Sequence, residues 1–130
     1  MTKKDLQQLY WTKRNIQALE NKLLELETEA TRVTTQLSND PKGPRKIEDK
    51  QGELVIKMIE VQEEINRQLE KAYVCMAKIE KAIEALPARE AYLIRLRYMD
   101  LKSWESICVE MHYSWKHIHR IHSEALKLLA

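Results

Sequence analysis

The fold is decided by a stretch near the C-terminus, residues 103–129, which reads SWESICVEMHYSWKHIHRIHSEALKLL. Ser103 and Ser114 each precede a short amphipathic run, and a serine in that place accepts a hydrogen bond from a free N–H of the first helical turn. Only His112, Tyr113 and the cap Ser114 separate the two runs. Two capped helices joined this tightly predict a helix-turn-helix, with helices over residues 104–111 and 115–129.

A further helix is indicated just before this motif. Tyr92, Leu93 and Leu96 recur at helical spacing, and Pro87 suits a first helical turn while forcing the residue before it out of helical dihedrals. We therefore expect a helix over residues 88–98 and a three-helix head over residues 87–130. The inner faces of the two capped helices are expected at Ile107, Cys108, Met111, Ile118, Ile121, Ala125, Leu128 and Leu129.

Residues 1–86 carry a different pattern. Apolar side chains recur at alternating spacings of three and four over residues 16–37 and again over 54–86, which is typical of long helices with one narrow apolar seam. The run SNDPKGP at 38–44 indicates a loop between them. Helices over about 3–37 and 46–85 are expected to pair as a long antiparallel hairpin, a coiled coil, in an all-α fold.

A two-helix hairpin buries little apolar surface, so we expect its remaining apolar surface to pack on a second copy of the chain, giving a homo-oligomer such as a dimer. The alternative is that the first helix folds back on the C-terminal head within a monomer. The residues assigned to self-association are Ile16, Leu19, Leu23, Leu26, Val33, Met58, Val61, Ile65 and Leu69.

The composition argues against several classes of protein. The 130 residues carry a net charge of +2, and no apolar run approaches the roughly 18 residues of a membrane span. The N-terminus lacks the apolar core of a signal peptide, so a cytoplasmic protein is expected. Cys75 and Cys108 are expected to be reduced, buried thiols. Without a glycine-rich phosphate loop or carboxylates in a cleft, we expect no enzyme and no cofactor.

A helix-turn-helix places its second helix in the major groove of DNA, so the motif predicts binding to double-stranded DNA. Charge is a weaker signal. Residues 1–86 are neutral overall, whereas residues 87–130 hold seven Lys and Arg, five Asp and Glu, and all four histidines. A strongly basic nucleic-acid domain would hold more cations.

The head resembles region four of bacterial sigma factors, which reads the −35 promoter element. The resemblance rests on Arg89-Glu90-Ala91, Arg95-Leu96-Arg97-Tyr98, Ser103-Trp104-Glu105, Ile107, Ser114, Ile118, Ile121, Ala125, Leu126 and Leu129. The whole layout is similar to the late transcription regulators of Gram-positive phages, the RinA/ArpU-like superfamily. That resemblance implies a phage or prophage activator of late genes in a bacterial host cell, with RNA polymerase as a further partner.

The resemblance also implies roles for individual residues. The base-reading positions fall on Trp115, Lys116, His119 and Arg120, where Lys or Arg donates to guanine. Contacts to the DNA backbone are expected from Arg89, Arg97, Ser103, Trp104, Ser114 and His117. Trp104 has an alternative interpretation as a hydrophobic anchor of the head, and Trp115 as a residue packed inward.

Four histidines, at positions 112, 117, 119 and 122, lie close together. Their spacing lacks a carboxylate–histidine motif, so no metal site is expected. We expect instead a protonatable face that binds DNA more tightly below about pH 6.5. His112 also stands where such turns often carry glycine, which predicts a distorted turn.

Two other functions fit the same pattern. A small terminase subunit joins a helix-turn-helix to helical oligomerisation segments, recognises viral DNA for packaging and forms rings. A helical protein-interaction module that has lost DNA binding would fit the modest charge. Stoichiometry in solution separates the terminase from a dimeric or monomeric regulator.

Overall fold

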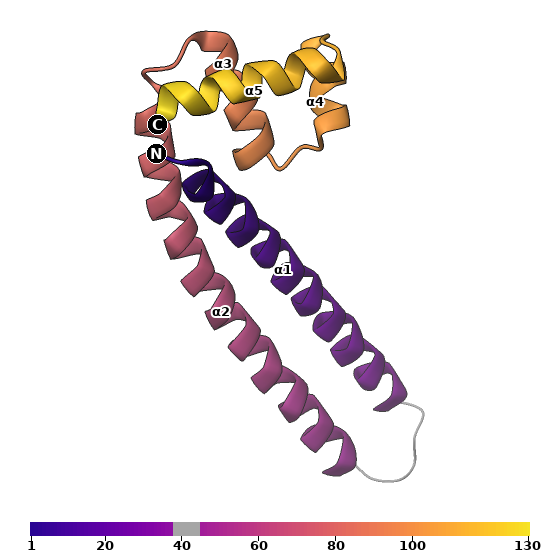
Figure 1. Ribbon diagram of the computed structural model, residues 1–130. Coiled ribbons are helices and arrows are strands. Elements are labelled where there is room, and N and C mark those ends of the chain that lie inside the picture. Colours follow the sequence, from indigo (N-terminus) through magenta and orange to yellow (C-terminus); the bar gives the residue numbers. More distant parts are fainter. Residues whose placement is uncertain (38–44) are drawn as a thin grey trace. The chain divides into compact units, whose positions relative to one another are not determined.

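The computed structural model describes residues 1–37 and 45–130, with side chains described for residues 1–33 and 49–130. The helices are α1 (Lys3–Leu37), α2 (Arg45–Ile83), α3 (Ala88–Ile94), the π-helical turn η1 (Arg95–Met99), α4 (Trp104–Met111) and α5 (Trp115–Leu129) (Figure 1). No strand occurs in these ranges. The predicted all-α fold is confirmed, and the loop expected at residues 38–44 lies outside the described residues.

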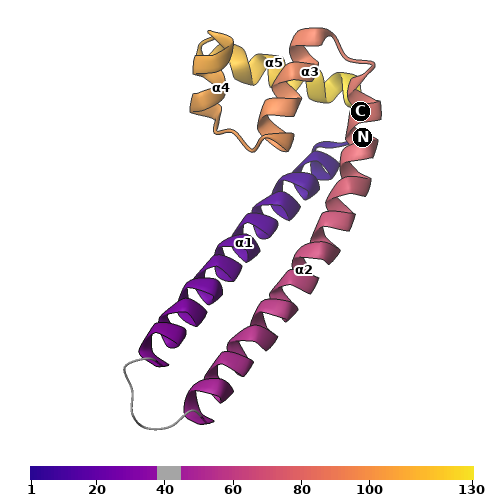
Figure 2. The same ribbon diagram turned by 180° about the vertical axis from the view of Figure 1, so that it is seen from behind.

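The two long helices pack against each other as an antiparallel hairpin, and three shorter helices follow (Figures 1 and 2). The chain divides into two compact units, one of residues 15–68 and one of residues 1–14 with 69–130. The division differs from the ranges 1–86 and 87–130 expected from Pro87. The first turns of α1 and residues 69–83 of α2 belong with the head.

The unit of residues 15–68 is held by one apolar seam. Ile16 and Val33 on α1 are buried, as are Leu54, Val61 and Ile65 on α2. Since the unit contains only these two helices, each closes the seam of the other. The spacing of three and four in the sequence therefore marks the contact within the hairpin.

The larger unit has a core to which both ends of the chain contribute. Leu6 and Leu9 of α1 are fully buried, as is Ile83 of α2. Lys13 donates its Nζ hydrogen to the carbonyl of Met99. The head's own cluster consists of Leu93, Leu96, Ile107, Ile118 and Ile121, with Trp104, Cys108, Met111 and Tyr113 packed against it.

The helix-turn-helix has the caps that its serines predict. The Ser103 hydroxyl accepts from the backbone N–H of Ser106 at 3.1 Å, and the Ser114 hydroxyl accepts from that of His117 at 3.2 Å. His112 takes the left-handed conformation, with φ 60°. The N–H groups of residues 112 and 113 bond the carbonyls of residues 109 and 108 at 3.4 and 3.1 Å. The turn is thus a regular helix ending with histidine in the place that glycine favours.

The third predicted helix differs from the expectation. The α-helix ends at Ile94, and the next turn, Arg95–Met99, is π-helical. In that turn the Asp100 N–H donates to the Arg95 carbonyl at 2.9 Å. Two side chains expected in the core are on the surface. Tyr92 is 44% exposed and donates its hydroxyl to Glu110, and Leu128 is 60% exposed.

Gly52 provides a test of α2 near its start. A methyl group added there meets no atom within 4 Å. We expect Gly52→Ala to raise the free energy of unfolding by about 0.5–1 kcal/mol, because alanine loses less backbone entropy in a helix. Ala18→Gly, at an exposed position of α1, should lower it by a similar amount. Urea unfolding followed by circular dichroism measures both, and a destabilised Gly52→Ala protein would contradict the described helix at residue 52.

Candidate nucleic-acid interface

The second helix of the helix-turn-helix, α5, carries an exposed basic stripe. Lys116, Arg120, Ser123 and Lys127 are all exposed. They recur at i, i+4, i+7 and i+11, which places them on one face of the helix, over about 16 Å. The opposite face is buried in the head. Lys116 and Arg120 are predicted from the sequence, whereas Lys127 is not, although its spacing of seven from Arg120 is a usable signal.

The cations of this stripe differ from three other cations of the head, which have carboxylate partners. Those ion pairs join Arg89 to Glu90, Arg95 to Glu80 and Lys102 to Glu110. The cations hold the pKa of the three carboxyl groups below the ordinary value, chiefly through side-chain hydrogen bonds. Within the described ranges, no ion pair involves Lys116, Arg120 or Lys127. The stripe is therefore a positive surface of the head whose cations make no ion pair in the described ranges.

The four residues expected to read bases fall into two groups. Lys116 and Arg120 lie on the stripe, and Trp115 is 54% exposed beside them. His119 is half-buried, with its ring centre 4.7 Å from that of Trp104 and 4.5 Å from that of Trp115. Its Nε2 is closed off from solvent and has no hydrogen-bond partner among the described residues. The His119 ring is thus engaged in packing and offers no exposed Nε2 to a base.

Arg97 and Trp104, both expected at the DNA backbone, contact each other. The Arg97 guanidinium carbon lies 4.6 Å from the ring centre of Trp104 and 4.8 Å from that of Tyr10. Its Nη1 donates to the carbonyl of Lys102 at 3.0 Å. Trp104 packs against the head's apolar cluster, as the anchor interpretation expects. Arg97 therefore makes a cation–π contact with α1 and with α4.

The other residues expected at the DNA backbone lie at helix ends. Arg89 is exposed in the first turn of α3, and Ser103 and Ser114 are exposed caps. His117 is half-buried, with its ring centre 4.4 Å from that of Tyr113. The exposed N–H groups at the start of α5 favour an anion at that helix end.

His122 does not belong to a protonatable face. It is buried, and its Nε2 lies 2.6 Å from the hydroxyl oxygen of Tyr98. Burial is the main cause that lowers the pKa of His122 to about 4, with smaller contributions from Lys3, His119 and Arg97. Burial also raises the pKa of Tyr98 to about 12. The expectation of a proton-driven gain in affinity near pH 6.5 is therefore wrong for this residue.

The buried neutral His122 predicts a pH-dependent stability. Between pH 6.5 and about 4, an unfolded chain binds a proton at this residue that the folded chain does not bind. The free energy of unfolding should be unaffected above pH 6.5 and should fall by roughly 3 kcal/mol across that window. Urea unfolding at pH 7.0, 5.5 and 4.5 measures the loss. His122→Gln should show a shallower slope, and an equal slope in both proteins would contradict the assignment.

The nine residues assigned to self-association differ in burial. Ile16, Val33, Val61 and Ile65 are buried, and the other five, Leu19, Leu23, Leu26, Met58 and Leu69, are half-buried. The four buried residues are covered by the partner helix of the same chain and present no free surface to a second copy. Among the described side chains of α2 in the smaller unit, the exposed apolar ones are Val55, Ile56 and Ile59.

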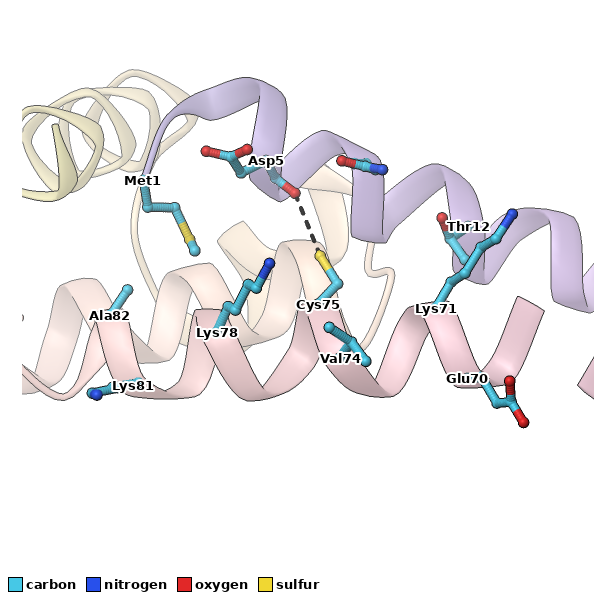
Figure 3. A pocket seen from close by; sticks show the side chains of 11 residues that line it. Met1, Asp5, Thr12, Glu70, Lys71, Val74, Cys75, Lys78, Lys81 and Ala82 are labelled. Carbon is cyan, nitrogen blue, oxygen red and sulfur yellow. Dashed lines mark hydrogen bonds between the residues drawn. The ribbon is translucent and has the colours of Figure 1, made fainter. Parts of the chain in front are cut away.

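An open groove of about 880 Å³ lies between the first turns of α1 and residues 70–82 of α2 (Figure 3). Cys75 points toward α1 and its thiol donates to the Asp5 carbonyl at 3.8 Å. Burial raises the pKa of this thiol, so it stays protonated at neutral pH. Cys75 and Cys108 are both free and half-buried, rather than buried as expected.

Comparisons with known proteins add no functional information. A scan of protein-family models, a search of curated proteins and a search of solved structures each found no match to this chain. In the described ranges, no helix is long and apolar enough to cross a membrane. The same ranges contain no group of three or more metal-binding side chains. The interpretation of the site therefore rests on its geometry and charge.

Proposed function

We propose that the chain is a double-stranded DNA-binding transcription regulator. The observation that carries this proposal is the stripe of unpaired cations on the exposed face of the second helix of a helix-turn-helix. In such motifs the N-terminal residues of the second helix contact base edges in the major groove. Here those residues include Trp115, Lys116 and Arg120.

Each side chain has a role that its chemistry supports. Arg120 and Lys116 donate to guanine O6 and N7, and Trp115 provides an apolar contact to a thymine methyl group. Lys127, about 16 Å from Lys116 along α5, adds a phosphate contact, and Arg89 adds a second on α3. The base contacts specify the sequence and the phosphate contacts set the salt dependence.

The wider biological role is proposed on the resemblance to sigma region four and to phage late regulators. The regulator acts at promoters of a phage or prophage in the cytoplasm of the bacterial host, activates late genes and contacts RNA polymerase. It needs no cofactor and catalyses no reaction.

Removing the two stripe cations at the start of α5 tests the DNA proposal. A random-sequence duplex library first yields the preferred site, and fluorescence anisotropy then measures the dissociation constant. We expect the double substitution Lys116→Ala with Arg120→Ala to weaken binding at least about 30-fold, because each good base contact contributes about 1–3 kcal/mol. It should also reduce the slope of log affinity against log salt.

A matched control separates base contacts from general charge. Lys57→Ala with Lys71→Ala removes the same charge from exposed positions of α2 and should change the affinity less than about threefold. Equal effects of the two double substitutions would contradict the recognition-helix assignment. If the library selection enriches no sequence at low salt, the chain is instead a protein-interaction module.

We further propose that two copies associate through the face of α2 formed by Val55, Ile56 and Ile59. These side chains are 49%, 57% and 53% exposed and lie within an arc of about 100° on the helix. A hairpin with one apolar seam has little core of its own, so burying this face would stabilise it. Two joined heads would also bind DNA more tightly, because the second head binds at a high effective concentration.

Charge on this face should prevent association. We expect Ile56→Lys with Ile59→Lys to shift the protein toward monomers in sedimentation velocity runs. Association would remove water from two unpaired ammonium groups, and this desolvation costs free energy. Ala18→Lys with Asn21→Lys adds the same charge, at the same spacing of three, to exposed positions of α1 and should leave the dimer intact. A monomeric parent protein would contradict self-association, and a ring of eight or more subunits would favour the terminase function.

A further inference from the structure

A small polar cavity of about 190 Å³ lies in the larger unit, where the first turns of α1 meet η1, α4 and α5. It is separate from the basic stripe, because Lys116, Arg120 and Lys127 do not line it. The residues that line it are Lys3, Gln7, Tyr10, Trp11, Arg97, Tyr98, Trp104, His119 and His122. Two of these are cations and none is a carboxylate.

The absence of a carboxylate sets this cavity apart from the other charged contacts of the head. Arg89, Arg95 and Lys102 each pair with a glutamate. Arg97 has no ion pair in the described part of the chain and contacts only neutral groups, two aromatic rings and a carbonyl. Lys3 likewise has none there. Two cations around one cavity repel each other unless a negative group joins them.

Other lining residues supply hydrogen-bond donors without opposing an anion. The amide of Gln7 and the indole N–H of Trp11 and Trp104 are donors by their chemistry. His119 also lines the cavity, with its ring packed against Trp104 and its Nε2 closed off from solvent. His122 stays neutral because burial and the positive charges of Lys3 and Arg97 disfavour its protonation.

We propose that this cavity binds one phosphate-type oxyanion, held by Lys3 and Arg97. The volume suits a single tetrahedral anion with ordered water and is too small for a drug-sized ligand. Charge-assisted hydrogen bonds from both cations would satisfy the anion in a partly closed site. The first turns of α1 supply Lys3 and Gln7, so the site depends on α1 packing against the head. The proposal stands independently of the DNA-binding function.

The test uses inorganic phosphate and the full chain. Trp11 and Trp104 line the cavity, so phosphate binding should change tryptophan fluorescence. We expect a saturable change on titration with sodium phosphate, and no saturable change with sodium chloride at matched ionic strength. Lys3→Gln should weaken the phosphate affinity about tenfold, because it removes one charge-assisted hydrogen bond. Lys4→Gln, at an exposed neighbouring position that does not line the cavity, should leave it unchanged.

A second pair of variants tests whether the cavity binds an anion because it has no carboxylate of its own. Gln7→Glu places a carboxylate among the lining residues, four positions after Lys3, and should abolish the phosphate response while raising the thermal midpoint. Gln8→Glu creates the same i, i+4 relation with Lys4 outside this cavity and should keep the phosphate response. Gln7 and Gln8 are both exposed, so we expect both variants to fold, and circular dichroism checks this.

The outcomes distinguish this proposal from the DNA proposal. A phosphate response that is absent, or equal in Lys3→Gln and Lys4→Gln, overturns the anion site whatever the protein does with DNA. A saturable response lost in Lys3→Gln and in Gln7→Glu supports it, even in a protein that binds no duplex. Where DNA binds as well, competition identifies the source of the anion. If the DNA affinity is lower at saturating phosphate than in chloride of matched ionic strength, the cavity binds a phosphate of the DNA backbone. If the DNA affinity is the same in both salts, the cavity binds a free anion.

Discussion

The Arg97 guanidinium joins the elements of the larger unit. It contacts Tyr10 of α1 on one side and Trp104 of α4 on the other, at 4.8 and 4.6 Å from the ring centres. Trp104 in turn contacts His119 and His122 of α5, with ring centres 4.7 and 4.8 Å apart. A continuous series of ring contacts thus runs from the first turns of the hairpin to the helix that carries the basic stripe. A lysine could not replace this arginine, because it lacks the planar group that stacks on both rings.

Arg97 lies within the π-helical turn η1. A π-turn inserts one residue into the helix, which rotates the side chains that follow by about 100° relative to a regular α-helix. Within the turn, Tyr98 and Met99 are both buried. The chain then leaves the helix through Leu101 with φ 57°, a conformation that costs about 1–2 kcal/mol for a residue with a Cβ. The surrounding packing must offset this cost for the turn to persist.

The sequence predicts the elements that depend on local rules. The serine caps at 103 and 114, the spacing of three and four in the hairpin and the break before Pro87 each depend on a few neighbouring residues, and each is found as predicted. The π-turn and the burial of His122 depend on contacts between residues far apart in the chain, such as Tyr98 with His122 and Arg97 with Tyr10. Periodicity therefore gives the existence of a helix, and it does not show which partner covers each face.

The difference between local rules and long-range contacts also explains which site residues were predicted correctly. Helical periodicity placed Lys116, His119 and Arg120 near one face of α5, but only two of them remain on the surface, because the rings of Trp104 and Trp115 cover His119. The seam residues of the hairpin were assigned to a second copy because the sequence does not distinguish a partner helix within the chain from one outside it.

The unpaired cations of the larger unit therefore differ in their surroundings, and that difference determines what each can bind. Lys116, Arg120 and Lys127 lie along an exposed helix face, where each charge is well hydrated and interacts weakly with a single ion. Such a row gains affinity only from a ligand with many charges, which releases counterions along its length. Arg97 lies half-buried against aromatic rings with Lys3 nearby, where lower hydration strengthens the attraction of one anion. A net charge of +2 thus conceals two kinds of positive site: an extended stripe suited to a polyanion and a cavity suited to one small ion.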